Sequence, residues 1–386
     1  MAYKLAEHVI DRHDISKLIQ WLEQNPQLTK GALTRQFEEQ WAKWVGTRYA
    51  IFCNSGSSAN LLMAYAALTF GKLRNKKVIV PSIGWATTIA PFIQFGFKPI
   101  MCGADKDTYA LDANCLERLL QRHGAATVIL VQVLGVPAVM EPIMELRRTY
   151  DFLLLEDACA ALGAQYCGKK VGSFSNMSSF SFYFGHQLST IEGGMVNTND
   201  EDLYNLLIML RSHGWGKDLD LQTRSRLMKK YRIDEFHEPF TFFVPGFNLR
   251  STDANAFLGL LQMAKADHVT AIRKRNHLLY AERLTCVDYQ KWSMASDPCS
   301  ISFGALARDG EHRKRIVTAL SEHAIETRLF SAGNLGRHPF WFERYGVFRD
   351  SVADRVHDCG FFLPNNESLT EDDVTFICEV VNNVKP

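Results

Sequence analysis

Five positions in the sequence carry side chains suited to holding and working on a charged aromatic ring. They are Ser57 in NSGSSAN (residues 54–60), Trp85 in IGWATT, and Asp157 directly after FLLLE. The other two, Ser181 and His186, lie in SFYFGHQLSTIEGG. Serine hydroxyls and the first N–H groups of a helix bind anions. A tryptophan offers a flat face for stacking. A buried aspartate needs a cationic partner, and a histidine moves protons near neutral pH.

Each of these residues also has a purely structural interpretation. A serine of NSGSSAN suits a helix N-cap. Trp85 suits a core or an interface, and Asp157 suits helix capping or pairing with a lysine. His186 suits a hydrogen-bonded structural role. None of the residues is specific alone, so the prediction rests on their order and spacing together.

The elements that must position these residues alternate along the first 250 residues. Short apolar runs such as RYAIFC, KVIVPS, ATVILVQVLG and FLLLED are followed by amphipathic stretches such as SSANLLMAYAAL and PIMELRRTY. This alternation predicts an α/β fold with a parallel sheet covered by helices on both faces. Ligands of such sheets bind beyond the carboxyl ends of the strands. The residues that follow each strand are therefore the candidates for chemistry.

The pattern changes after about residue 248. DANAFLGLLQMAKADHVTAIRKRNHLLYAERL predicts a long helix, and short strands and helices follow it. We therefore predict two domains, a large one with an N-terminal arm over residues 1–248 and a smaller α/β domain over residues 249–386 that is hinged on the long helix.

Composition excludes several classes of function. The 43 Lys and Arg residues nearly cancel the 42 Asp and Glu residues, which argues against a general nucleic-acid binder. No apolar run approaches the roughly 20 residues that span a bilayer, and the polar N-terminus predicts no secretory signal. The nine cysteines are scattered without the spacing of a metal site. We expect a cytoplasmic protein that binds neither metal nor membrane.

The stretch from LTKGALTRQFEEQWAKWVG through GFNLRSTDANAFLGLLQM resembles the sugar aminotransferase family of fold type I pyridoxal phosphate (PLP) enzymes. The resemblance covers most of the chain and is weaker over the first 25 and last 50 residues. It implies a large domain with a mostly parallel sheet of the seven-stranded type between helices, and homodimers with active sites at the subunit interface. It also implies PLP, or its amino form PMP, as the cofactor.

The resemblance further implies a set of cofactor-binding residues. It assigns Gly56, Ser57 and Ser181 to the phosphate, Trp85 to stacking on the ring, and Asp157 to the pyridine nitrogen. Asn248 would reach the phosphate bound in the neighbouring subunit. One position departs from the family pattern, because Ala160 stands where a glutamine or an acid usually contacts the ring hydroxyl.

The lysine of the family falls on His186 in this sequence. A lysine links covalently to PLP, whereas a histidine does not, so the cofactor should be bound non-covalently with PMP as a resident species. A histidine here resembles the sugar 3-dehydratases of the family, as does RLFSAGNL. Those enzymes use PMP to remove the C3 hydroxyl of a nucleotide-linked 4-keto-6-deoxy sugar, with His186 implied as the catalytic acid–base group.

Two subtypes of 3-dehydratase exist, and the segment after HGWG distinguishes them. One subtype carries an iron–sulfur cluster there and receives electrons from a reductase, and a cluster needs about four cysteine thiolates. The segment from HGWG to PGFN contains no cysteine in this sequence. It therefore resembles the other subtype, of the kind that serves colitose biosynthesis, which takes an amino group from glutamate and releases ammonia without a reductase or a cluster.

Glutamate and a diphosphate sugar both require cations. The candidates for substrate binding are His213, Arg250 and Arg328. A surface arginine paired with a carboxylate is the alternative for each. Two other functions also stay open: a nucleotide-sugar aminotransferase or other PLP elimination enzyme, and a catalytically silent binding or regulatory protein.

Overall fold

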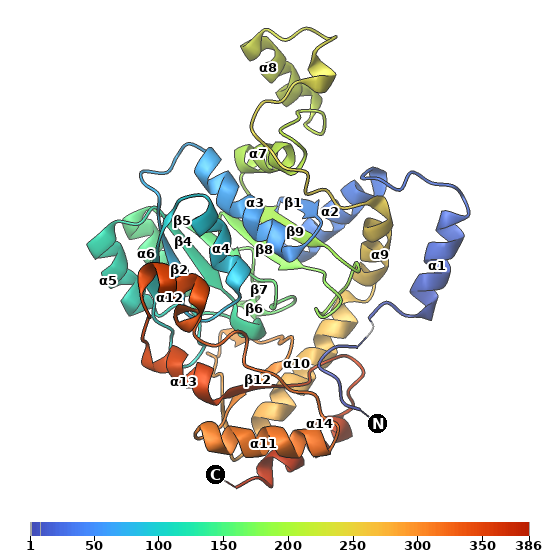
Figure 1. Cartoon of the computed structure of the whole chain (residues 1–386). Coiled ribbons are helices and arrows are strands. Elements are labelled where there is room, and N and C mark those ends of the chain that lie inside the picture. The colour runs from blue at the N-terminus through green and yellow to red at the C-terminus, as the bar shows by residue number, and fades with distance from the viewer. Residues whose placement is uncertain (1, 8, 386) are drawn as a thin grey trace.

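A seven-stranded sheet forms the centre of the chain in this computed structural model, which describes residues 2–7 and 9–385 (Figure 1). Its strands, in order across the sheet, are β1 (Tyr49–Cys53), β9 (Gly194–Thr198), β8 (Met177–Ser181), β5 (Leu153–Asp157), β4 (Thr127–Val131), β2 (Lys77–Pro81) and β3 (Lys98–Cys102). Only β9 runs antiparallel to its neighbours. The predicted mostly parallel sheet is confirmed.

Helices cover both faces of this sheet, because the strands alternate their side chains between two apolar layers. Ile51 and Cys53 of β1 face one layer, and Ala50 and Phe52 face the other. The first layer contains α3 (Gly56–Thr69), α4 (Ala86–Gln94) and α7 (Glu201–Arg211). The second contains α2 (Ala32–Val45), α5 (Ala113–His123), α6 (Met140–Tyr150) and α9 (Asp253–Met263).

Side-chain caps begin several of these helices. Asp112 accepts a hydrogen bond from the N–H of Cys115 at the start of α5, and Gly124 ends that helix with a left-handed φ of 58°. Helix α2 is capped from a distant part of the chain, because the Asp253 carboxylate accepts from the N–H groups of Gly31, Leu33 and Thr34. This contact fixes α2 against α9.

The last third of the chain surrounds a second, antiparallel sheet with the order β10-β12-β13. Its elements are β10 (Asp288–Tyr289), β12 (Phe303–Leu306), β13 (Gly360–Leu363), α10 (Ala266–Arg283), α11 (Gly310–Glu322), α12 (Pro339–Tyr345), α13 (Ser351–Cys359) and α14 (Glu371–Asn382). A third small sheet joins β11 (Ser296–Asp297), β6 (Gln165–Tyr166) and β7 (Lys169–Lys170). The described residues also form the short 3-10 helices η1 (Val133–Gly135), η2 (Glu238–Phe240) and η3 (Leu335–Arg337). The domain boundary at residue 248 stays a prediction.

The long helix predicted after residue 252 is divided into α9 and α10. The division falls at Lys265, whose ammonium group lies 2.7 Å from carboxylate oxygens of both Asp11 and Asp14. Asp11 and Asp14 form a capping box at the start of α1 (Arg12–Leu22). A contact with the N-terminal arm thus lies at the point of division, and the helical pattern of the sequence does not encode such a contact.

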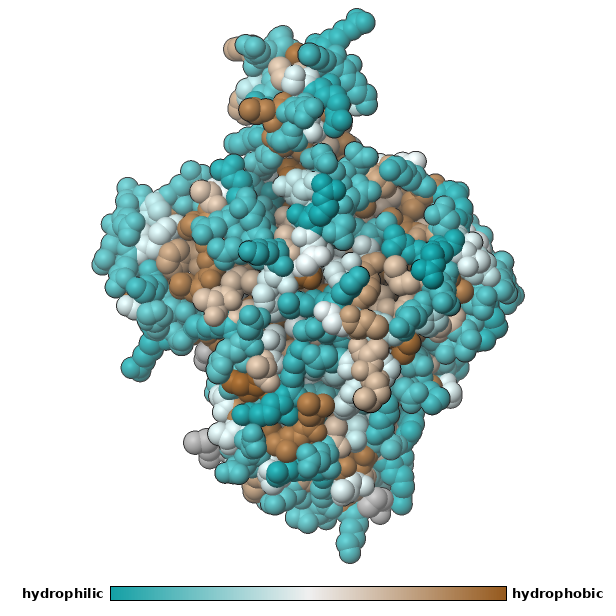
Figure 2. All heavy atoms as spheres, turned by 180° about the vertical axis from the view of Figure 1, so that it is seen from behind, coloured by the Kyte–Doolittle hydropathy of each residue, from teal (hydrophilic) through white to brown (hydrophobic). Residues whose placement is uncertain are grey.

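A segment between residues 213 and 247, which includes α8 (Leu221–Tyr231), protrudes from the body of the molecule (Figure 1). The segment exposes large apolar side chains, namely those of Leu221, Tyr231, Phe236, Phe240 and Phe242. Figure 2 shows apolar side chains on this protrusion amid a mostly hydrophilic surface. Among the helices of the described residues, none is long and apolar enough to cross a membrane.

Glu156 is a fully buried acid on β5. Its carboxylate accepts a hydrogen bond from the N–H of Gly172, and its Oε2 atom has no partner among the described residues. Burial raises the pKa of Glu156 to about 8, although Gly172 and Arg147 act in the opposite direction. Between about pH 4.5 and pH 8, the folded protein therefore keeps a proton on Glu156 that the unfolded chain releases.

We expect Glu156→Gln to stabilise the protein increasingly as the pH rises. Because the folded pKa of Glu156 is raised, its stabilising contribution is complete below about pH 4.5 and is lost as the pH rises toward 8. Glutamine removes this loss, which amounts to at most about 1.4 kcal/mol per pH unit. Urea denaturation at pH 5 and pH 8 measures the difference, with the exposed Glu145→Gln as the control. A gain independent of pH would contradict the expectation.

Candidate active site

The carboxyl ends of three strands meet at one edge of the sheet. Cys53 of β1 and Ser181 of β8 both pair with Gly194, the first residue of β9. On the next strand, Asp157 pairs with Ser179. The strand ends that the sequence singled out therefore lie side by side.

The start of α3 lies directly against Ser181. A Cβ atom on Gly56 would come within 2.5 Å of the Ser181 Cβ, so this close approach requires glycine. Ser55 caps the helix and accepts from the N–H of Ser58 at 3.0 Å. The N–H groups of Gly56 and Ser57 belong to the first helical turn, which has no intrahelical acceptors, and Ser57 is exposed. This arrangement is suited to binding a phosphate.

Asp157 ends β5 and is buried, with 5% of its surface exposed. Its carboxylate accepts hydrogen bonds from Nδ2 of Asn60 at 2.8 Å, Oγ1 of Thr88 at 2.6 Å and the N–H of Cys159 at 3.1 Å. Donors from α3 and α4 therefore hold the aspartate in one orientation, as a buried carboxylate aimed at a cation requires. These contacts include no lysine, so they do not support the interpretation of Asp157 as the partner of a lysine.

Trp85 is the N-cap residue of α4, and its side chain is 57% exposed. The first turn of this helix contacts both the start of α3 and the end of β5. Thr87 accepts from the Ser57 hydroxyl at 3.2 Å, and Thr88 donates to Asp157. The tryptophan thus begins the helix that links Asp157 to the serine loop, by which we mean residues 54–58.

His186 lies in a turn after β8, where its N–H donates to the carbonyl of Tyr183 at 2.9 Å. Its Nδ1 atom is buried and has no hydrogen-bond partner in the described part of the chain. The pKa of His186 is lowered to about 4, mainly by burial and to a smaller extent by Arg273 and Arg328, while Asp157 and the backbone of Cys159 act in the opposite direction. The imidazole is therefore neutral at neutral pH and available as a base.

Arg328 is one of the charges that act on His186. Its guanidinium carbon lies 5.1 Å from the centroid of the Phe362 ring, and Tyr183 interacts with it electrostatically. The structure thus brings this candidate for substrate binding close to the histidine.

The other two candidates for substrate binding lie at the base of the protrusion. The His213 ring contacts the Trp215 ring at a centroid distance of 4.9 Å, and the Arg250 guanidinium carbon lies 5.9 Å from the Trp215 ring. The exposed Asn248 pairs through its backbone with Ser212. Arg250 pairs with Cys53, so this group adjoins the start of the serine loop rather than His186.

Three residues that the sequence analysis did not single out orient the site, namely Asn60, Thr88 and Gln187. Asn60 and Thr88 hold Asp157. The side-chain oxygen of Asn60 also accepts from the Ser179 hydroxyl at 2.6 Å. Both residues stand in the segments NSGSSAN and IGWATT, so their polar character directly after strands was the available signal. The amide of Gln187 donates to the carbonyl of Ala160 at 3.2 Å.

These residues fit PLP or PMP on the geometry of the chain alone. Glycine at position 56 lets the Ser181 hydroxyl approach the first turn of α3, so hydroxyl and N–H donors gather at one helix start, as a phosphate group needs. A buried, fully oriented carboxylate suits a protonated ring nitrogen, and the unpartnered nitrogen of His186 suits a proton-transfer role. The arrangement can therefore bind the cofactor and move protons beside it without a covalent link.

Comparison with known proteins agrees with this geometry. A family model described as the DegT/DnrJ/EryC1/StrS aminotransferase family matches residues 9–382. The chain is 30% identical over 374 residues to GDP-4-keto-6-deoxy-D-mannose 3-dehydratase of Escherichia coli O55:H7, covering 95% of this chain and 96% of that protein. It is 34% identical over 364 residues to GDP-perosamine synthase of Caulobacter vibrioides, covering 92% and 90% of the two chains.

Solved structures show the same fold. The E. coli GDP-4-keto-6-deoxy-D-mannose 3-dehydratase with bound hydrated PLP matches with a TM-score of 0.89 and 26% identity, over 99% of this chain and all of that chain. A histidine-to-asparagine variant of GDP-4-keto-6-deoxymannose 3-dehydratase with bound GDP-perosamine also gives 0.89, at 27% identity. The predicted fold class, the resemblance to PLP-dependent sugar enzymes and the similarity to 3-dehydratases are confirmed.

Proposed function

Because the chain belongs to the DegT/DnrJ/EryC1/StrS aminotransferase family, we propose that it is a PLP/PMP-dependent 3-dehydratase of a nucleotide-linked 4-keto-6-deoxy sugar. Glutamate supplies the amino group, and ammonia leaves with the 3-deoxy product. The reaction belongs to dideoxysugar biosynthesis for surface polysaccharide in the cytoplasm. The relatives named for a 3-dehydratase of a GDP-linked sugar support this substrate class.

The observation that carries the proposal is a neutral histidine at the site where the family is expected to have lysine. His186 lies within the electrostatic reach of Asp157, and its buried Nδ1 has no partner among the described residues. A group with these properties accepts and returns protons but forms no covalent link with PLP. Such a site favours loss of the C3 hydroxyl over simple amino transfer.

The remaining residues of the chain bind and orient. Gly56, Ser57 and Ser181 hold the phosphate, Trp85 stacks on the ring, and Asp157 keeps the ring nitrogen protonated. PMP, when bound, supplies the amine and the conjugated ring that takes up electrons. His186 moves the proton at the carbon next to the ring. Arg328, beside His186, is the cation best placed for a substrate carboxylate or phosphate.

The protein acts as a homodimer in this proposal. The protrusion exposes Phe236 and Phe240, at 87% and 73%, and exposed apolar side chains of this size mark interaction surfaces. Asn248, at the base of the protrusion, then reaches the phosphate bound by the partner subunit, with His213 and Arg250 beside it at the interface.

We expect Asn248→Ala to weaken PMP binding. Loss of one hydrogen bond to a charged phosphate costs about 1.5–3 kcal/mol, which is roughly a tenfold to hundredfold rise in Kd. Spectroscopic titration with PMP measures the change, and sedimentation checks that the variant stays dimeric. An unchanged Kd in a dimeric variant would show that Asn248 does not contact the phosphate.

The proposed function is tested with the purified protein, PLP, glutamate and GDP-4-keto-6-deoxymannose, with no reductase added. We expect the mass of the product to show loss of the C3 oxygen, and we expect iron analysis of the active protein to find no stoichiometric iron. Turnover that strictly depends on a reductase would place the protein in the cluster-containing subtype.

Amino transfer is the second candidate function, because identity to GDP-perosamine synthase reaches 34%. It predicts a stable 4-amino sugar instead of ammonia. A catalytically silent protein is the third candidate, but the three donors that orient Asp157 support a working cofactor site.

A further inference from the structure

Gln187, the residue next to His186, is fully buried although its turn also contains the exposed Tyr183 and Phe184. Its side-chain amide donates to the carbonyl of Ala160 at 3.2 Å and to the carbonyl of Cys299 at 3.4 Å. Three segments that are distant in sequence therefore meet at one side chain. They are the turn of His186, the turn that follows Asp157, and the segment that precedes β12.

We propose that Gln187 is the positioning residue of His186, because its amide clamps the turn that carries the histidine onto the turn that follows Asp157. A catalytic histidine is commonly oriented by a hydrogen bond to its second ring nitrogen. Nδ1 of His186 has no such bond within the described residues, and the backbone of Cys159 is the group that hydrogen-bonds the imidazole. The backbone of Cys159 lies against His186, and the adjacent carbonyl of Ala160 binds Gln187.

The polar atoms around Gln187 support this role over simple packing. Its Oε1 atom is buried without a partner among the residues that the structure describes, which is destabilising. A methionine would fill the same space without that penalty. The two donated hydrogen bonds are thus what distinguishes glutamine at this position.

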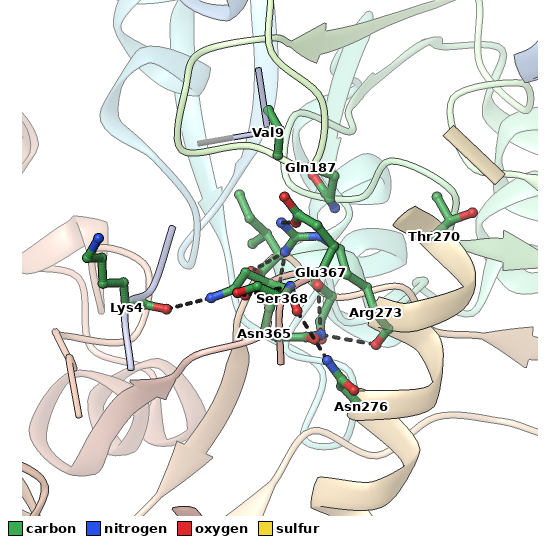
Figure 3. A network of polar contacts seen from close by, with 12 residues as sticks. Lys4, Val9, Gln187, Thr270, Arg273, Asn276, Asn365, Glu367 and Ser368 are labelled. Atoms are coloured by element: carbon green, nitrogen blue, oxygen red, sulfur yellow. Dashed lines mark hydrogen bonds and ion pairs between the residues drawn. The ribbon is translucent and has the colours of Figure 1, made fainter. Parts of the chain in front are cut away.

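The far side of the clamp is held by further hydrogen bonds. Figure 3 shows the polar network beside α10 in which Gln187 is drawn with Arg273, Asn365 and Glu367. The buried Arg273 donates to the carbonyls of Ile301 and Asn365 and pairs with Glu367 at 3.0 Å. The N–H of Cys299 donates to Gly135 at 2.9 Å. The carbonyl that holds Gln187 therefore belongs to a segment that is itself fixed on both sides.

The inference rests on the proposed function, and its test uses a matched pair of glutamines. Gln262 is also buried, donates to Val9 and Asp14, and has an unpartnered Oε1, but it lies on α9 away from His186. We expect Gln187→Met to lower kcat by about tenfold to hundredfold, as a small misplacement of a catalytic group does. The Kd for PMP should change by less than about twofold, since Gly56, Ser57 and Asp157 are untouched.

The pH profile separates positioning from general stability. The charged groups that face His186 are Asp157 from β5, Arg273 from α10 and Arg328 from the segment before η3. Loss of the two hydrogen bonds of Gln187 loosens the turn and exposes the imidazole to water, so the acid limb of kcat should shift to higher pH in Gln187→Met. Gln262→Met should lose stability without this shift. If Gln187→Met does not fold, Gln187→Asn replaces it in the test, because the shorter amide does not reach Ala160. The same changes in kcat and in the acid limb are then expected of Gln187→Asn.

One result would overturn the positioning role of Gln187, and a different result would overturn the proposed function. If Gln187→Met behaves as Gln262→Met in both kcat and the acid limb, Gln187 does not position His186. His186→Ala, measured in parallel, tests the proposed function itself, because an active His186→Ala variant would remove the histidine from the reaction.

Discussion

Replacement of His186 by lysine is expected to lower the rate of C3 dehydration by about 10²–10⁴-fold, the usual contribution of a positioned acid–base group. The environment that lowers the pKa of His186 to about 4 is one in which burial and two arginines disfavour a cation. A lysine there would lose its proton readily and link covalently to PLP. The variant should be yellow and should form traces of 4-amino sugar.

Borohydride treatment followed by intact mass measurement distinguishes the two proteins. The wild-type protein should retain no cofactor mass, because the cofactor is held by hydrogen bonds and stacking alone. The His186→Lys variant should retain one pyridoxyl group at residue 186. Dehydration within a few-fold of the wild-type rate would show that His186 is only structural.

Replacement of Asp157 by asparagine is expected to lower kcat/KM by roughly 10²–10⁴-fold. Removal of one partner from a buried charge pair costs about 3–5 kcal/mol, and the cationic ring nitrogen would be that partner. The asparagine amide would also face the donors of Asn60 and Thr88, which both point at the present carboxylate. Steady-state kinetics with glutamate and the sugar, together with a PMP titration, measure the loss.

Glu156→Gln is the matched control for this substitution. Glu156 precedes Asp157 on β5 but faces the opposite layer, and burial already raises its pKa to about 8. Its change to glutamine should therefore leave activity near the wild-type value at neutral pH. Equal losses in the two variants would attribute the effect of Asp157→Asn to damage of β5 rather than to the cofactor.

Local signals in the sequence were sufficient for the sheet and for the residues at its edge. Buried strands such as β4 are almost entirely apolar, and parallel strands place their carboxyl ends together, so the sequence alone assigned Ser181 and Asp157 to one edge. The resemblance to the family supplied the expected role of each residue, which no local pattern encodes.

Contacts between distant segments could not be predicted in this way. Asn60 and Thr88 donate hydrogen bonds to Asp157, and Gln187 donates one to Ala160. These contacts depend on how helices and turns pack in three dimensions. The pKa of His186 also differs from the expected value near neutrality, which ignores burial and the charges of Arg273 and Arg328. The division between α9 and α10 likewise depends on a contact with the N-terminal arm.

The fate of the amino nitrogen tests the central claim most directly. The protein is incubated with PLP, GDP-4-keto-6-deoxymannose and glutamate labelled with nitrogen-15, and the products are followed by mass spectrometry and NMR. Elimination assisted by His186 predicts that the label is released as ammonium and that the 3-deoxy sugar contains no nitrogen. Label retained on C4 of a sugar that keeps its C3 hydroxyl would identify an aminotransferase and contradict the account.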